Sequence, residues 1–230
     1  MNTINQLAVF DLETTGLDLA NSKIVTACVA LIDASGNLIG EAQEWLANPG
    51  IEIPAIAASV HGVTTEYAIE HGRPLAEVVG EINAKLGEFF AAGIPVVAYN
   101  ASYDFTILRS NSLALGLPEL AEPKPVIDPL IVDRHYDKWR KGKRTLTAST
   151  ELYGVSLGDD AHNATADAIA AGQVALAVLN KFKVLEELTL EQLHENQIAW
   201  SLEQDQSFNK FLIGQGKSPI TDFGWPIRGI

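Results

Sequence analysis

Apolar residues in the N-terminal half of the chain form short extended runs separated by polar turns. Residues 4–11 and 24–33 are rich in Val, Ile and Ala, and a turn-prone DASGN sequence leads into a third run around 38–46. Runs of this composition bounded by turn signals predict β-strands, and we expect these three to form an antiparallel meander. Two shorter apolar runs, 94–99 and 125–128, predict further strands, the first of them buried in the centre of the sheet.

Helical periodicity fills the segments that follow these strands. Apolar residues recur there at spacings of three and four, with Pro54 and Pro74 where helices favour proline and Gly93 and Gly116 just past the expected ends. The segments with this pattern are 54–62, 74–93, 104–116, 145–155 and 163–182. The alternation of strands and helices predicts an α/β domain.

The chain changes character after about residue 185. Residues 189–215 have the pattern of one long amphipathic helix, and residues 216–230 are rich in turn formers. We therefore expect a domain at 1–184 and a C-terminal helical and irregular extension at 185–230, packed on that domain or on a partner. The sequence leaves the role of this extension and the oligomeric state open.

Composition narrows the class of protein. The 230 residues include 29 acidic and 16 basic side chains, and the formal charge of −13 argues against a general coat of positive potential but not against a local basic patch. Cys28 is the single cysteine, so an internal disulfide is impossible. No basic and apolar leader opens the chain, and its apolar runs are far shorter than the roughly 18 residues of a membrane span. We expect a cytoplasmic protein with no membrane partner.

Two acidic residues end the first expected strand, in the sequence AVFDLETTGLD. Asp11 and Glu13 are two positions apart, so on a strand they share one face. Their charges repel each other unless a cation compensates them or one carboxylate takes up a proton. The alternative is that these acids simply reach solvent at the strand end, since an Asp-x-Glu triplet arises by chance about once in a few hundred positions.

Two more acidic positions follow at element ends. Asp104 comes after the run 94–99 and opens a helix, where an aspartate also stabilises the positive helix end by a few tenths to about 1 kcal/mol. In DDAHNATADAIA, Asn163 is a good N-cap, which leaves His162 in the preceding loop and Asp167 just inside the helix, both able to face one cleft. Taken singly, each residue has an ordinary structural explanation, and only the combination indicates a site.

In this order, the four acids and His162 resemble the motifs of the DEDD-type 3′-to-5′ exonucleases, in the DEDDh subgroup whose last motif is His-x4-Asp. FDLETTGLD, NASYDF and HNATAD are the three motifs, and the resemblance covers about residues 5–182. NPG and SVHGVT between the first two are similar to the branch of polymerase proofreading (epsilon) subunits, in a family that includes RNase T and oligoribonuclease. The resemblance implies an RNase H-like fold: a mixed five-stranded sheet, with an antiparallel meander plus parallel strands, flanked by helices. Tyr99 departs from the family pattern, in which many relatives have a histidine before the asparagine, and this leaves substrate preference less defined.

The resemblance also implies a reaction with two divalent cations, Mg²⁺ or Mn²⁺. Asp11 would bridge both ions, Glu13 and Asp167 would hold the ion on the nucleophile side, and Asp104 would support the other. Carboxylate oxygens are hard ligands that suit these ions, and a pair of ions about 3.5–4 Å apart stabilises both the attacking and the leaving oxygen. His162 would act as the general base.

The turn after the first strand is the expected contact with the 3′ end. Thr14, Thr15 and Gly16 are small, so their backbone amides can approach a terminal nucleotide, and the family resemblance places His61 in the same pocket. Asn100 is a further pocket candidate. The alternatives are a helix-terminating loop role for His61 and local backbone bonding for Asn100.

A basic run stands out against the acidic composition. Residues 133–144 hold six of the sixteen basic residues. Such a run is usually a solvated helix face or loop, but in an acidic chain, with Trp139 available for base stacking, it also predicts a patch that follows a nucleic-acid backbone. We assign substrate contacts in this run to Lys141, Lys143 and Arg144.

The sequence therefore predicts a metal-dependent exonuclease that releases nucleoside 5′-monophosphates from the 3′ end of single-stranded nucleic acid, with DNA favoured. An RNA- or oligoribonucleotide-specific exonuclease is an alternative, because no short motif reveals how the 2′-hydroxyl is read. A non-catalytic adaptor bound to a DNA polymerase subunit and a phosphohydrolase of small nucleotides are two others. The complete set of carboxylates argues against the adaptor, which has no need of them.

Overall fold

The computed structural model describes residues 4–120, 122–155 and 164–229. Within these ranges the chain forms a mixed sheet of six strands in the order β4-β3-β2-β1-β5-β6. β1 pairs with β2, and β2 with β3, in antiparallel fashion, whereas the β1–β5, β5–β6 and β3–β4 pairs are parallel. The strands are β1 Gln6–Thr14, β2 Ile24–Asp33, β3 Gln43–Asn48, β4 Arg73–Pro74, β5 Val96–Val97 and β6 Val126–Ile127.

The α/β fold and the antiparallel meander that the sequence predicts are confirmed. β1 and β2 are buried along most of their length, which explains why their apolar runs are nearly continuous. The expectation of five strands is wrong by one. The additional strand, β4, consists of Arg73 and Pro74 alone and pairs with the end of β3. Two exposed residues, one of them a proline, show no alternation that a sequence pattern can detect.

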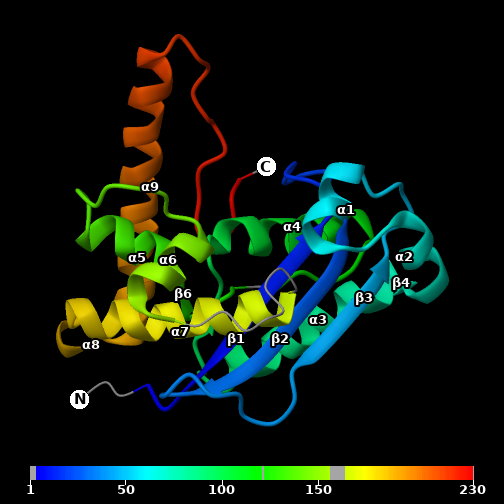
Figure 1. The fold of residues 1–230 in the computed structure, drawn as a ribbon, viewed down its shortest axis with the longest axis horizontal. Coiled ribbons are helices and arrows are strands. Elements are labelled where there is room, and N and C mark those ends of the chain that lie inside the picture. The colour runs from blue at the N-terminus through cyan, green and yellow to red at the C-terminus, as the bar shows by residue number, and fades with distance from the viewer. Residues whose placement is uncertain (1–3, 121, 156–163, 230) are drawn as a thin grey trace.

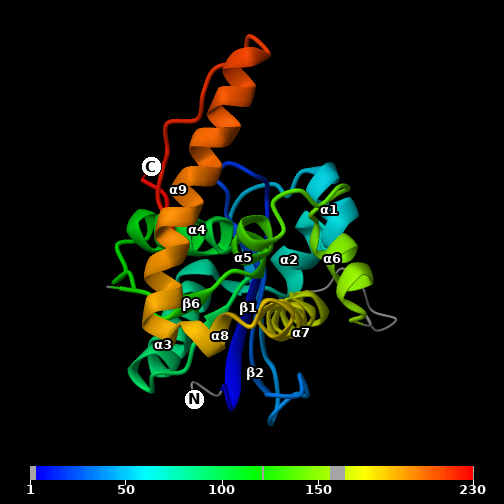
Figure 2. The same cartoon turned by 90° about the vertical axis from the view of Figure 1, so that its left-hand side faces the viewer.

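Helices cover both faces of the sheet, which Figure 2 shows nearly edge-on. α3 (Leu75–Ala91) and α4 (Ala101–Ala114) pack on one face, and α7 (Ala164–Phe182) crosses β1 and β2 on the other. α7 comes close because Gly172 faces the sheet. A Cβ atom at that position would lie 2.5 Å from atoms of both Val9 and Ile32, so any larger residue would force the helix and sheet apart.

The remaining helices are short, apart from the last. α1 (Ala55–His61) and α2 (Thr65–His71) connect β3 to β4, while α5 (Pro129–Tyr136) and α6 (Leu146–Tyr153) pack against α7. α8 (Val184–Glu187) is a single turn. α2, α5 and α8 have no counterpart among the predicted helices, whereas α1 and α6, of similar length, lie within the predicted segments 54–62 and 145–155. None of the helices in the described ranges has the length and apolar character that a membrane span requires.

The long helix α9 (Leu190–Gly214) rises out of the globular body, and the last segment of the chain returns beside it (Figures 1 and 2). A capping box at Thr189 and Gln192 fixes its start. Near the body, Trp200 is buried and stacks on His135 of α5 with ring centroids 4.0 Å apart. The returning segment is anchored by Arg228, whose guanidinium donates two 3.0 Å hydrogen bonds to Asp205 of α9.

Side chains of α9 cover the outer edge of the sheet. The backbone N–H of Val126 in β6 donates to Nδ1 of His194 (3.1 Å), and the Val126 carbonyl accepts from Nε2 of Gln197 (3.0 Å). Oε1 of Gln197 accepts from the backbone N–H of Asp128 (2.7 Å). Gln197 is fully buried, so its amide replaces the partner strand that an edge strand lacks.

Candidate active site

Asp11 and Glu13 lie near the C-terminal end of β1, opposite Cys28 and Thr26 of β2. Asp104 reaches the same place from the first turn of α4, and its carboxyl is 3 % exposed. Oδ1 of Asp104 accepts a hydrogen bond of 3.1 Å from the backbone N–H of Leu12, the residue between the two acids of β1. This contact ties the start of α4 to the end of β1.

Asp167 lies in the first turn of α7, the helix that crosses β1 and β2. Its charge acts on both acids of β1 and raises the pKa of Asp11 and of Glu13. The structure therefore brings together the four acidic residues that the sequence singles out. His162 lies outside the described residues.

Burial and mutual repulsion raise the pKa values of three of these carboxyl groups, those of Asp11, Glu13 and Asp104. Burial is the larger cause at Asp11 and Asp104, and the pKa of both lies well above its ordinary value. Burial and the charge of Asp167 raise the pKa of Glu13 to about 7. Ionising all of these carboxyl groups together is thus unfavourable, and a bound cation would stabilise their charged forms.

The pKa of Glu13 gives a test of this repulsion. Because it is raised from an ordinary value near 4.5 to about 7, the stability that depends on protonated Glu13 is complete below pH 4.5 and is lost as the pH rises through 7. In the presence of a chelator, we expect the melting temperature of the wild type to fall by a few degrees across this window. Glu13→Gln should show a smaller fall, and equal slopes in calorimetric scans of the two proteins would contradict the assignment.

The donor set suits Mg²⁺ or Mn²⁺, because it consists of carboxylate oxygens. The pKa values of the Asp11, Glu13 and Asp104 carboxyl groups are raised when no cation is bound. In the ranges 4–120, 122–155 and 164–229, however, no three His, Cys, Asp or Glu side chains are arranged as a ready metal site. The chemistry of the residues fits divalent ions, and side-chain rotation at the cluster would have to complete the coordination.

A hollow of about 430 Å³ lies beside Glu13, and His61 and Tyr67 line it from α1 and α2. Nδ1 of His61 accepts from the backbone N–H of Val63 at 3.2 Å. Nε2 is buried near the backbone of Thr14, and no described residue forms a hydrogen bond of normal geometry with it. Burial lowers the pKa of His61, so its imidazole is neutral at pH 7 and offers an N–H at the rim of the carboxylate cluster.

The turn after β1 is held by its own hydroxyl groups. Oγ1 of Thr14 lies 2.5 Å from the Tyr103 hydroxyl, and both reach the carbonyl of Gly16, at 2.7 and 2.8 Å. Oγ1 of Thr15 accepts from the backbone N–H of Lys23 at 2.9 Å. The threonine side chains therefore shape this turn, and Tyr103 of the second motif fixes it against α4.

The position of α4 depends on Asp128, which the sequence analysis did not single out. Asn100, at the N-cap of α4, has a left-handed backbone with φ of 66°, and its N–H and that of Ala101 donate to Asp128 at 3.1 and 2.9 Å. Asp128 is buried, which raises its pKa to about 6. The signal that could have found it is Asp before Pro129, a pairing typical of a helix N-cap followed by proline.

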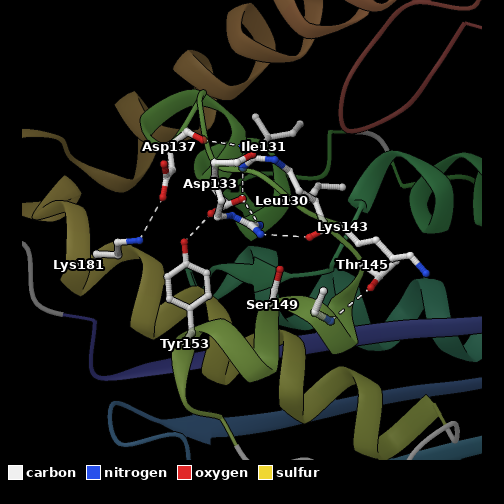
Figure 3. A network of polar contacts seen from close by, with 12 residues as sticks. Leu130, Ile131, Asp133, Asp137, Lys143, Thr145, Ser149, Tyr153 and Lys181 are labelled. Carbon is white, nitrogen blue, oxygen red and sulfur yellow. Dashed lines mark hydrogen bonds and ion pairs between the residues drawn. The ribbon is translucent and has the colours of Figure 1, made fainter.

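The basic run folds around one buried carboxylate, Asp133, whose side chain is 2 % exposed (Figure 3). Nη2 of Arg140 lies 2.7 Å from Asp133, the hydroxyl of Tyr153 lies 2.5 Å from it, and Arg144 donates to the same carboxylate. Arg144 also donates to the carbonyl of Asp137 at 2.6 Å. This arginine is therefore engaged within the protein.

Lys141 and Lys143 remain exposed in the same loop, and neither forms an ion pair with a described residue. Trp139 is 87 % exposed. The sequence grouped these residues with Arg144, but it does not distinguish a cation that faces solvent from one that closes a loop.

Removing the Asp133 carboxylate should loosen this loop. Asp133→Ala leaves two partly buried guanidinium groups without their counter-ion, and we expect a loss of about 3 kcal/mol in the free energy of unfolding, measured by urea denaturation. Asp137→Ala is the control, because its pair with Lys181 is half-exposed and worth about 0–1 kcal/mol. Similar losses in both variants would contradict the role of Asp133.

The sequence signature of a family described as "Exonuclease" matches residues 8–175. A DNA polymerase III subunit epsilon-like protein of Rhodobacter capsulatus is 30% identical over 177 residues, which are 76% of this chain and 24% of that protein. A PolC-type DNA polymerase III of Streptococcus suis is 30% identical over 203 residues, 88% of this chain and 13% of that protein. The chain thus spans a quarter or less of the length of these curated relatives.

Solved structures share the fold. E. coli exonuclease I in complex with a dA16 oligonucleotide superposes with a TM-score of 0.65 at 20% identity, over 79% of this chain and 42% of that one. Exonuclease X in complex with 5′ overhanging duplex DNA gives a TM-score of 0.61 at 19% identity, over 83% of this chain and 99% of that one.

Proposed function

Because the chain belongs to the DEDD-type exonuclease family of the RNase H-like superfamily, whose signature covers residues 8–175, we propose that it is a metal-dependent 3′-to-5′ exonuclease of single-stranded nucleic acid. The observation that carries the proposal is the Asp104 carboxylate bonded to the backbone between Asp11 and Glu13, with the charge of Asp167 acting on both. Structural acids that merely reach solvent have no reason to concentrate in this way.

The proposed roles follow the residues' positions and the family pattern. Asp11, Glu13 and Asp167 hold one divalent ion, and Asp11 and Asp104 hold a second. Divalent ions held by these residues would lower the pKa of the attacking water and stabilise the departing 3′ oxygen. His162 accepts the proton of that water. We propose that both ions are Mg²⁺ or Mn²⁺, because every proposed ligand is a carboxylate.

Binding of the terminal nucleotide is assigned to the hollow beside Glu13. His61 lines the wall of this hollow, and the turn at Thr14, Thr15 and Gly16 directly follows Glu13 in the chain. Asn100 stands at the N-cap of α4 on the other side of Asp104. Lys141 and Lys143 remain the proposed contacts to the nucleic-acid backbone in the basic loop, whereas the third candidate, Arg144, would first have to leave Asp133.

DNA is the proposed substrate class. The relatives named above are DNA polymerase III proteins, and E. coli exonuclease I carries a dA16 oligonucleotide. The same relatives support a DNA polymerase subunit as a proposed partner and proofreading or repair as the proposed context. An RNA-specific exonuclease stays the alternative, because recognition of the 2′-hydroxyl depends on pocket contacts.

A direct assay tests the function. The protein is incubated with 5′-labelled single-stranded DNA, 5′-labelled RNA of the same sequence, or a free nucleotide, each with Mg²⁺, Mn²⁺ or a chelator. We expect a ladder of products that shortens from the 3′ end of the DNA and disappears with the chelator. Cleavage of RNA alone selects the alternative substrate, cleavage of the free nucleotide alone selects a phosphohydrolase, and no cleavage in any arm selects the adaptor.

A further inference from the structure

A second and larger cavity, of about 740 Å³, lies outside the carboxylate cluster, where α5, α9 and the returning C-terminal segment meet. α5 contributes one wall with Arg134, His135 and the adjoining Lys138, and α9 contributes another. The side chains of α9 that line it include Trp200, Phe208 and Phe211. Figure 1 shows the two segments that frame this space, the projecting helix and the chain end beside it. The cavity thus uses residues of the extension beyond 185, for which neither the carboxylate cluster nor the basic loop supplies a role.

The cavity adjoins the catalytic helix. Asn100 and Ser102 are among the residues that line it; they are the N-cap and the second residue of α4, whose fourth residue is Asp104. The cavity therefore reaches the N-terminal end of the helix that carries Asp104. We infer that this cavity holds the part of a single-stranded nucleic acid that lies 5′ of the bond to be cleaved, an inference that rests on the proposed function.

The charges on the two walls suit a phosphate backbone on the α5 side. Arg134 and Lys138 are exposed, and neither forms an ion pair with a described residue. Four acids also line the cavity: Asp205 is paired with Arg228 and Asp128 accepts from three backbone N–H groups, whereas Glu203 and Asp222 form no ion pair with a described residue. Lysine and arginine without internal partners are the groups that exchange counter-ions for phosphates.

The aromatic residues on the α9 side suit bases. Phe208 and Phe211 lie nearly parallel, with an interplanar angle of 20°, and are 47 % and 59 % exposed. His135 is exposed and stacks on Trp200 at an interplanar angle of 15°, which fixes one face of the imidazole ring. Aromatic faces that bases can stack on, opposite a row of cations, are the arrangement by which proteins hold single strands without reading their sequence.

The first test measures binding rather than cleavage. Asp11→Asn serves as the background so that the oligonucleotides stay intact, and fluorescence anisotropy gives the affinity for labelled single-stranded DNA of about 4 to 16 nucleotides, the range of single-strand binding sites. The affinity should rise with the length of the oligonucleotide. The double variant Arg134→Glu with Lys138→Glu should lose that rise, and its affinity for the longest oligonucleotide should fall about tenfold or more. The loss of two phosphate contacts should also flatten the slope of log affinity against log salt by about 1.4.

A matched control separates a local effect from a change of net charge. Lys210→Glu with Lys217→Glu makes the same kind of charge reversal at exposed lysines of α9 and the segment after it, outside the cavity lining. We expect these variants to keep the rise of affinity with length. An equal loss in both double variants, or no loss in Arg134→Glu with Lys138→Glu, would overturn the inference.

The second test asks whether the occupant is a nucleic acid or an apolar peptide. Phe208→Leu with Phe211→Leu keeps apolar surface but removes the stacking faces, and we expect the longest oligonucleotide to bind at least about fivefold more weakly. Unchanged affinity would overturn base stacking and favour a peptide in the cavity. If the wild type fails to cleave DNA but the binding effects of the variants are seen, only the proposed function is rejected. If the wild type cleaves DNA but none of these binding effects is seen, only this inference is rejected.

Discussion

Replacing Asp11 with asparagine should lower the rate of 3′-end hydrolysis at least about a thousandfold and make the metal-free protein more stable. The loss corresponds to about 4 kcal/mol of transition-state stabilisation, because Asp11 is the proposed ligand of both ions. The gain in stability of the metal-free protein has a different cause. Asp11 is partly buried and is repelled by Asp104, Glu13 and Asp167, so a neutral amide of similar volume removes an unfavourable charge.

Thermal unfolding with and without Mn²⁺ separates these two effects. At about one hundred times its dissociation constant, an ion stabilises the wild type by about 2.7 kcal/mol, which in a chain of this length raises the melting temperature by roughly 5–10 °C. Asp11→Asn should melt above the wild type in chelator and gain little from Mn²⁺. Asp33→Asn, at the opposite end of the β1–β2 pair, serves as the control and should keep wild-type activity. A variant of Asp11 that retains the Mn²⁺ response would contradict the ligand role.

His162→Ala should lower turnover about a hundred- to ten-thousandfold, the usual range for loss of a general base, while the stabilisation by Mn²⁺ survives. The imidazole is proposed to accept a proton, not to hold an ion, so activity and metal binding should separate.

His71→Ala is the matched control, because His71 is a half-exposed histidine at the end of α2. It should leave both the rate and the Mn²⁺ response unchanged. If His162→Ala loses the Mn²⁺ response in proportion to its activity, His162 acts on the metal site rather than as the base.

The sequence predicted those parts of the fold whose signals are local. β1 and β2 are long and almost uninterruptedly apolar, and α7 extends over nineteen residues, so composition and periodicity suffice to find them. β4, β5 and β6 have two residues each; β5 and β6 lie within longer apolar runs that predict them, whereas β4 is an exposed Arg-Pro pair with no such run. This explains why the number of strands was one too low.

The residues of the candidate site likewise include some that the sequence reveals and some that only the fold reveals. Asp11, Glu13, Asp104 and Asp167 were found because they stand at the ends of predicted elements in a recognisable order. Asp128 and Gln197 were missed, since their importance lies in hydrogen bonds to distant backbone groups, which no spacing reveals. The same limit applies to the basic loop, where only the fold shows that Arg144 points inward to Asp133.

His194 and Gln197 cover the edge strand β6, and this contact determines what a C-terminal truncation would do. A protein ended at residue 184 would keep every residue of the family signature, which stops at 175, yet would expose the N–H and carbonyl of Val126 to other molecules. Open strand edges recruit further strands, so such a fragment should self-associate into insoluble material. Proteolytic cleavage within residues 183–189 should instead leave two fragments that copurify, because buried side chains of α9 remain bound to the edge strand β6.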